Sequence, residues 1–240
     1  MTETALKNRV ILITGATGAL GSVAAKACAR AGASVVLLGR SVPKLERLYD
    51  EIVSTGGQQP ALYPLDLAGA SEQDYADLAS TVQRELGGLH GLMHCAAELG
   101  HLCPLTELAG ERWQRLLHVN LTAPFLLTRA LMPLLLATKG AAAVFVGDSA
   151  VGDGKAFWGA YGVAKLGLGG YVRILKAETE NSELRTELFI PGPMRSPIRL
   201  RAYPGESLDT LPAPGIHAER IIQLLVTAEP PPIPDNGARS

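Results

Sequence analysis

Cysteine is scarce in this chain of 240 residues, which contains only Cys28, Cys95 and Cys103. An odd number of thiols without closely spaced pairs fits neither a disulfide framework nor a zinc site. We therefore expect three buried, reduced thiols, no disulfide bond and no metal site.

An excess of one charge and long apolar runs are also missing. The 22 Lys and Arg residues balance 23 Asp and Glu residues, and no basic stripe is present that would favour nucleic acid. No apolar run reaches the roughly 18 residues that span a bilayer. The first nine residues are polar and lead straight into an apolar run, unlike a secretory signal. We expect a cytoplasmic protein with neither a membrane nor a nucleic acid as partner.

What the sequence does contain is a regular alternation of two kinds of segment. Apolar runs of strand length lie at 9–14, 34–39, 61–67, 91–97, 142–147 and 187–190. Helix-like stretches lie between and after them, at 22–31, 41–55, 71–86, 111–138, 158–180 and 217–228. Continuous apolar runs are typical of strands covered on both faces. The alternation predicts one α/β domain over residues 1–240, a doubly wound parallel sheet (Rossmann fold) with a ligand crevice beyond the carboxyl ends of its strands.

Two segments depart from this alternation. Residues 191–215 are rich in Pro, Arg and Gly and are too long for a simple connection, so we expect them to form a substrate lid, called here the lid segment. The proline-rich tail at about 229–240 cannot continue a helix and is expected to be irregular.

A glycine-rich turn separates the first predicted strand from the first predicted helix. The turn is Gly15-Ala16-Thr17-Gly18-Ala19-Leu20-Gly21. Glycines allow a tight turn and a close approach of backbone to a pyrophosphate, while the helix N-terminus offers free N–H groups to phosphates. Strand, turn and helix together predict a dinucleotide-binding site.

Tyr161 and Lys165 are the strongest candidates for catalysis. Four residues apart on a predicted helix, they project from one face. A phenol with a pKa of about 10 needs about 4 kcal/mol to ionise at neutral pH, and one ammonium about 4 Å away can supply that energy. We therefore expect Lys165 to lower the pKa of Tyr161.

Together these residues resemble the short-chain dehydrogenase/reductase family over nearly the whole chain. The motifs are the loop 14–21, Asp66, Asn120 in His-Val-Asn-Leu-Thr-Ala, Ser149, the pair Tyr161 and Lys165, and the segment 191–197, Pro-Gly-Pro-Met-Arg-Ser-Pro. Leu-Leu-Gly-Arg at 37–40 and Trp-Gly-Ala-Tyr at 158–161 are most similar to a group of small bacterial oxidoreductases within that family.

The resemblance implies a role for each of four residues. Tyr161 would exchange a proton with the substrate oxygen while hydride moves between the nicotinamide and the substrate carbon. Lys165 would lower the Tyr161 pKa and hold the nicotinamide ribose. Ser149 would orient and polarise the carbonyl, unless it only caps the next segment. Asn120 would hold a water that links Lys165 to solvent, unless it only satisfies buried backbone groups.

The choice of cofactor depends on the end of the second predicted strand. A carboxylate there would accept hydrogen bonds from the 2'-hydroxyl of NAD, whereas this chain has Arg40, which suits a 2'-phosphate. NADP(H) is therefore favoured over NAD(H), although Arg40 could also be an unpaired surface residue. The resemblance further implies cofactor contacts at Asp66, Leu67, Cys95, Ala96, Ala97, Asn120, Tyr161, Lys165, Pro191, Gly192 and Met194, besides the loop residues Gly15, Thr17, Gly18, Ala19, Leu20 and Gly21.

Two other functions stay open. The glycine spacing 15, 18 and 21, and His94-Cys95-Ala96-Ala97 in place of an Asn-Ala-Gly run, are similar to epimerase-like or dehydratase-like enzymes of larger substrates. A protein that senses NADP without turnover is the third hypothesis, but such proteins commonly lose the Tyr-Lys pair. The intact pair favours a reductase or dehydrogenase of a small carbonyl or alcohol substrate.

The substrate wall and the assembly are the last expectations. A mostly apolar wall is expected from Leu99, Leu102, Phe157, Trp158, Met194, Ile198 and Tyr203, with Arg195, Arg199 and Arg201 as anion contacts. Three glycines, at 167, 169 and 170, lie inside a predicted helix where each costs up to about 1 kcal/mol relative to alanine. This cost suggests that something approaches the helix closely. The resemblance implies that this helix and the one spanning roughly 116–137 pack against their copies in a second subunit. We therefore expect a homodimer, with a homotetramer as the larger alternative and packing within the monomer as the rival explanation.

Overall fold

The computed structural model describes residues 4–226 and contains a six-stranded parallel sheet in the order β3-β2-β1-β4-β5-β6. The strands are β1 Val10–Thr14, β2 Ser34–Gly39, β3 Ala61–Pro64, β4 Gly91–His94, β5 Ala142–Val146 and β6 Arg185–Phe189. Thr14 at the end of β1 pairs with Leu38 of β2 and His94 of β4, so the neighbouring strands end at one level. Chain order reverses between β1 and β4, which places a crevice at their carboxyl ends.

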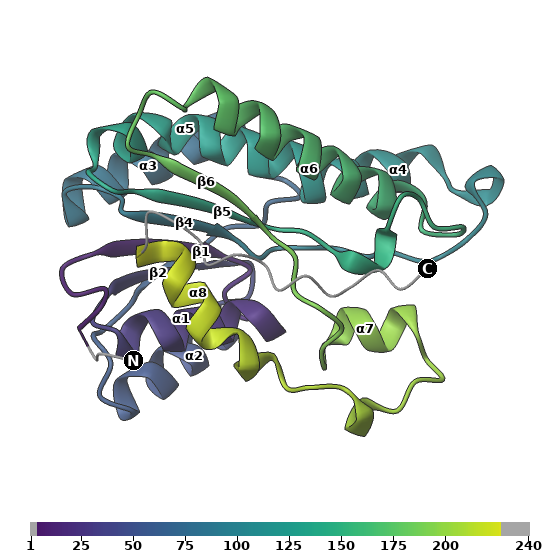
Figure 1. Ribbon diagram of the computed structural model, residues 1–240, viewed down its shortest axis with the longest axis horizontal. Helices are drawn as coiled ribbons and strands as arrows, with labels where there is room; N and C mark the ends of the chain where they lie inside the picture. The colour runs from purple at the N-terminus through teal and green to yellow at the C-terminus, as the bar shows by residue number, and fades with distance from the viewer. Residues whose placement is uncertain (1–3, 227–240) are drawn as a thin grey trace, which may run out of the picture.

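Helices cover both faces of this sheet (Figure 1). One layer contains α1 Ala19–Arg30, α2 Val42–Ser54 and α8 Ala218–Val226. The other contains α3 Glu72–Leu86, α4 Gly110–Leu117, α5 Ala123–Ala137 and α6 Gly159–Glu178. The predicted doubly wound α/β fold is confirmed.

Alternation along each strand creates two apolar cores. Ile11 and Ile13 of β1 face the layer of α1, α2 and α8, while Leu12 faces the layer of α3, α5 and α6, and all three are fully buried. Because side chains of a strand alternate between faces, continuous apolar runs are needed to fill both cores.

The predicted helix 111–138 is interrupted. A π-helical turn, His118–Thr122, joins α4 to α5 and carries Asn120. By length and composition alone, Gly110–Ala137 is apolar enough to cross a membrane. In the structure, however, Leu127, Leu131 and Leu135 of this stretch are fully buried against the sheet, as in the core helix of a globular domain.

Several boundaries differ from the predicted ones. β3 ends at Pro64 and β4 at His94, three residues earlier than the apolar runs, because beyond these points the chain leaves the sheet to line the crevice. β6 begins at Arg185, two residues before its apolar run. The predicted tail at 229–240 lies outside the described residues.

The lid segment is less irregular than predicted. It contains α7 Pro197–Ala202, whose cap Ser196 accepts a hydrogen bond from the Arg199 N–H at 3.1 Å. Figure 1 shows α7 beyond the end of β6, on the side of α1 and α8. Pro at the first helical turn and a Ser cap are a recognised start signal.

All three cysteines are free, but their burial differs from the expectation. Cys28 is buried, whereas Cys95 and Cys103 are partly exposed, because both lie in segments that follow β4 rather than in the core. The prediction of three buried thiols is therefore wrong for two of them.

Candidate active site

A cavity of about 380 Å³ opens at the carboxyl ends of the strands, beneath the lid segment. This volume lies within the range of small-molecule sites. Every sequence-predicted catalytic or cofactor residue except Asn120 lines it: Gly15, Thr17, Gly18, Ala19, Leu20, Gly21, Arg40, Asp66, Leu67, Cys95, Ala96, Ala97, Ser149, Tyr161, Lys165, Pro191, Gly192 and Met194. Segments far apart in the sequence thus meet at one site.

The glycine loop forms the floor of this cavity. Gly15 has a φ of +60°, and a Cβ at this position would lie 2.6 Å from the Ala96 Cα. A Cβ at Gly21 would overlap the Gly15 carbonyl oxygen. The Gly18 N–H donates to that oxygen at 2.9 Å, which closes the turn before α1. Because the glycines carry no side chains, a pyrophosphate can approach the backbone closely and bind the N–H groups at the N-terminus of α1.

Two cationic side chains, Arg40 and Lys44, line the cavity just beyond the end of β2. Arg40 follows β2, lines the cavity with Lys44, and is exposed. Within residues 4–226, Arg40 forms no ion pair. The end of β2 therefore offers a free guanidinium and no carboxylate.

Tyr161 lies in the wall of the cavity and is only 2% exposed. Its ring packs against Trp158, with centroids 5.8 Å apart, in a cluster that also contains Leu99 and Val151. Tyr161 Oη donates a hydrogen bond to Asp148 Oδ2 at 2.6 Å. Asp148 is a cavity residue that the sequence analysis did not select.

Lys165, one helical turn further along α6, is 7% exposed, and its Nζ donates to the Val146 carbonyl oxygen at 2.8 Å. Burial lowers the pKa of Lys165 to about 8, although the Asp148 charge opposes this shift. The pKa of Tyr161 is raised by burial, by the Asp148 charge and by the hydrogen bond to Asp148. The expected lowering of the Tyr161 pKa by Lys165 is therefore wrong for this arrangement, because the nearest charge to the phenol is a carboxylate.

Ser149 begins the 3₁₀ turn Ser149–Val151 at the exposed lip of the cavity. No hydrogen bond joins Ser149 to Tyr161 within the described range. Its neighbour Asp148 caps this turn by accepting from the Ala150 N–H at 2.8 Å. The capping role that was considered for Ser149 is therefore filled by Asp148. The available signal was a carboxylate two residues after β5 and 13 residues before Tyr161.

Asn120 is buried in the π-helical turn and uses its amide fully. Its Nδ2 donates to the carbonyl oxygens of Glu98 and Leu116, each at 2.8 Å, and its Oδ1 accepts from the Glu98 N–H at 3.1 Å. Asn120 thus fixes the strand-end segment that follows β4. The structure supports the backbone-satisfying alternative and leaves the water-holding role as a prediction.

His94 also lies near the site but faces the core. Its Nε2 contacts Thr128 Oγ1 at 2.9 Å, and its ring stacks on Phe145 with centroids 4.7 Å apart. Burial, followed by the charge of Lys165, lowers the pKa of His94 to about 3. We conclude that His94 is neutral and structural.

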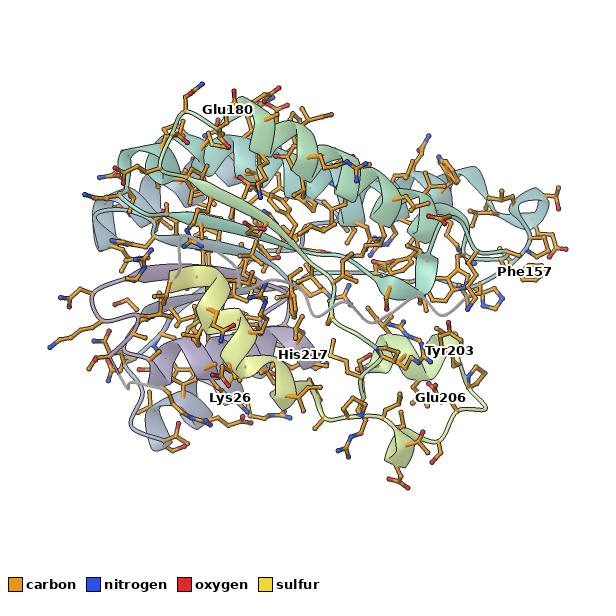
Figure 2. The ribbon with its side chains drawn as sticks, in the orientation of Figure 1. Lys26, Phe157, Glu180, Tyr203, Glu206 and His217 are labelled. Carbon is orange, nitrogen blue, oxygen red and sulfur yellow. The ribbon has the colours of Figure 1, made fainter. Side chains whose placement is uncertain are left out.

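The expected substrate wall is present in part. Trp158, Met194, Ile198, Tyr203, Arg199 and Arg201 line the cavity, whereas Phe157 is 59% exposed outside it and Arg195 does not line it. Leu99 and Leu102 pack behind the wall with Trp158. Figure 2 shows Tyr203 on the lid segment and Phe157 at the same end of the molecule.

A polar contact ties the lid segment to the rest of this wall, and others hold residues of the lid segment to one another. Lys155 Nζ donates to Tyr203 Oη at 2.6 Å. The Arg199 guanidinium lies 3.6 Å from the Tyr203 ring centroid and pairs with Glu206 at 2.5 and 2.6 Å. Both Arg199 and Tyr203 are thus held in place at the cavity mouth.

Known proteins match this arrangement over most of its length. Residues 9–206 match the short chain dehydrogenase family. The Escherichia coli oxidoreductase YciK is 37% identical over 209 residues, covering 87% of this chain and 82% of YciK. This agrees with the small bacterial group indicated by residues 37–40 and 158–161.

Solved structures agree closely with the fold. A short chain dehydrogenase from Pseudomonas syringae superimposes with a TM-score of 0.91 at 41% identity, covering 93% of this chain and 91% of the other. One from Escherichia coli CFT073, complexed with NADPH, gives 0.91 at 35% identity, covering 95% and 94%. With the glycine loop, the tyrosine and lysine on α6 and the parallel sheet in one arrangement, the chain belongs to the short chain dehydrogenase family of oxidoreductases.

Proposed function

We propose that this protein is an NADP(H)-dependent oxidoreductase that interconverts a small alcohol and its carbonyl compound, with Tyr161 as the general acid and base. The observation that carries the proposal is the burial of Tyr161 in the wall of the cavity whose floor is the glycine loop. When bound, the nicotinamide supplies or accepts the hydride. The chain supplies the proton and the orientation.

Cofactor binding is assigned to the residues that line the floor and the far end of the cavity. These residues all line the cavity. The loop 15–21 is proposed to face the pyrophosphate, Asp66 and Leu67 the adenine, Cys95, Ala96 and Ala97 the opposite side, and Pro191, Gly192 and Met194 the nicotinamide. Lys165 is proposed to hold the ribose, Ser149 to orient the carbonyl, and Asn120 to order a water near Lys165.

NADP(H) is the proposed cofactor because Arg40 is free at the end of β2 and a related enzyme was crystallised with NADPH. We predict that Arg40→Asp weakens NADPH binding about 10- to 100-fold, the scale of one hydrogen bond to a charged group, and strengthens NADH binding until the preference reverses. Calorimetric titration with both cofactors measures this. Arg47→Asp, the same change on an exposed α2 residue outside the cavity, is the control, and equal native affinities for NADPH and NADH would contradict the assignment.

The epimerase-like alternative is based on the glycine spacing, but the described part of the fold offers no additional domain to bind a larger substrate. Residues 4–226 form one sheet with its covering helices and the lid segment, and they contain no second domain for a larger substrate. A small, mostly apolar substrate fits the cluster around Trp158 better. Turnover of NADPH with a panel of aldehydes and ketones tests the proposal, and binding of NADPH without turnover would instead favour a sensor.

We also predict a homodimer through the outer faces of α5 and α6. Val163, Leu166 and Ile174 are 43–60% exposed and share one face of α6 with Gly170, whose Cβ position meets open space. Gly167 is explained within the monomer, since a Cβ there would contact Leu121. Light scattering is expected to give twice the 25.3 kDa chain mass.

The same face provides the test of this interface. Ile174→Glu should give a monomer, while Val42→Glu, at an exposed apolar position on α2, should not. A monomeric native protein at micromolar concentration would contradict the interface. A tetramer would require a further contact between subunits. We also propose that the protein is cytoplasmic and binds neither membranes nor nucleic acids.

A further inference from the structure

Asp148 brings a carboxylate into direct contact with the phenol of Tyr161. The two oxygens of this carboxylate have different donors: Oδ2 accepts from Tyr161 Oη at 2.6 Å, and Oδ1 accepts from the Ala150 N–H at 2.8 Å. The backbone bond fixes the carboxylate at the start of the turn after β5. The phenol proton is therefore directed toward Asp148.

The surrounding groups leave Asp148 as the counter-charge of Lys165. Burial lowers the pKa of His94 to about 3, and loss of hydration raises the pKa of the half-buried Cys95 thiol to about 12, so both are neutral over the ordinary pH range. The other charged side chains on the cavity wall are Arg40, Lys44, Asp66, Glu98, Arg199 and Arg201. Of all the charged groups on the wall, Asp148 accepts the hydrogen bond from Tyr161 Oη, and Lys165 places its Nζ 5.8 Å from the Tyr161 ring centroid.

This pairing changes what Tyr161 can do. A phenolate at Oη would place a second anion 2.6 Å from Asp148, and two like charges so close disfavour ionisation. A neutral hydroxyl, in contrast, can accept a proton at its oxygen while giving its own proton to a hydrogen-bonded acceptor. Tyr161 is thus arranged to pass a proton on rather than to keep it.

The geometry points to Asp148 as a further catalytic residue, the terminal proton acceptor and donor of the reaction, with Tyr161 as the relay. The assignment rests on the proposed function. In alcohol oxidation the substrate O–H bond breaks and its proton passes to Tyr161 Oη, while the Tyr161 proton passes to Asp148 Oδ2. The C–H bond breaks, hydride goes to the oxidised nicotinamide, and the C=O bond forms. Carbonyl reduction reverses each transfer and takes its proton from Asp148.

The first test follows the ionisation of Tyr161 without any substrate. The ultraviolet absorbance of phenolate is measured against pH, and Tyr161→Phe is subtracted to isolate Tyr161. In the native protein this signal should appear above pH 10, the ordinary range of a tyrosine. In Asp148→Asn it should appear about 1–3 pH units lower, because a like charge has been removed.

A matched variant controls for the loss of a carboxylate in the same loop. Asp153 is exposed and does not line the cavity, so Asp153→Asn should titrate like the native protein. Identical Tyr161 titrations in the native protein and in Asp148→Asn would overturn the inference.

The second test is the pH profile of kcat/KM for alcohol oxidation. The native enzyme should reach its plateau at a lower pH than Asp148→Asn, because only the variant must ionise Tyr161 before its oxygen can accept the substrate proton. Only in the variant should the half-plateau pH coincide with the titration of Tyr161. Asp148→Ser should behave like Asp148→Asn, which separates the loss of charge from a folding defect of one variant.

The outcomes distinguish the two proposals. An active native enzyme whose profile is unchanged in both Asp148 variants overturns the role of Asp148 alone. A native enzyme that turns over no alcohol, aldehyde or ketone overturns the proposed function, and with it the relay, whatever the titration of Tyr161 shows.

Discussion

Replacing Tyr161 by Phe is expected to lower kcat at least about a thousandfold while changing the affinity for NADPH by less than about threefold. General acid–base catalysis contributes roughly 10²- to 10⁴-fold, and the variant lacks the oxygen that is proposed to exchange a proton with the substrate. The ring still packs against Trp158, so the wall keeps its shape. Steady-state kinetics with a substrate from the carbonyl panel, together with calorimetry, measures both quantities.

Tyr75 offers a matched control for this substitution. It is fully buried in α3, away from the cavity, and its hydroxyl has no hydrogen-bond partner within the described residues. Tyr75→Phe removes the same oxygen and should keep full activity and stability. Substantial reductase activity in Tyr161→Phe would remove Tyr161 from its proposed role.

Replacing Gly21 by Ala is expected to cost NADPH affinity at least about a hundredfold and to destabilise the fold by about 1–3 kcal/mol, the usual range for overpacking. The added methyl group would overlap the Gly15 carbonyl oxygen, which is backbone and cannot rotate away. The loop must therefore open, and its N–H groups move from the positions that suit a pyrophosphate. Calorimetry and thermal unfolding measure the two effects.

Gly110 is the control because it differs only in its surroundings. It lies at the start of α4, and a Cβ there meets nothing within 4 Å. Gly110→Ala should leave NADPH binding unchanged and stabilise the helix slightly. If Gly21→Ala bound NADPH as the native protein does, the glycine loop would not be the pyrophosphate site.

The order of strands and helices could be predicted because local pattern and burial agree. Val10–Thr14 is apolar on both faces, and the structure buries it on both, so a continuous run was the correct signal. The π-helical turn at Asn120 could not be predicted in this way. Its apolar spacing continues that of α4 and α5, and only the amide contacts to Glu98 reveal why the helix widens there.

The residues that line the cavity could be predicted because they follow the ends of strands. The charged group that contacts Tyr161 could not be predicted. Asp148 and Ser149 are neighbours, and sequence spacing gave no means of deciding which side chain turns toward Tyr161. The choice depends on the direction in which β5 ends and on the Ala150 N–H that holds the carboxylate. Lys165 likewise was expected to act on the phenol, but its Nζ instead donates to the backbone carbonyl of Val146.

The contact between Lys155 and Tyr203 joins residues 48 positions apart across the mouth of the cavity. The bond is exposed, so by itself it contributes only about 0–1 kcal/mol, the scale of a surface polar pair. The rings of Trp158 and Tyr203, with centroids 6.1 Å apart, and the packing of Ile198 and Ala202 in the same cluster supply the rest of the contact. Opening the entrance therefore exposes apolar surface as well as breaking one bond, and the rate of this opening can limit how fast product leaves.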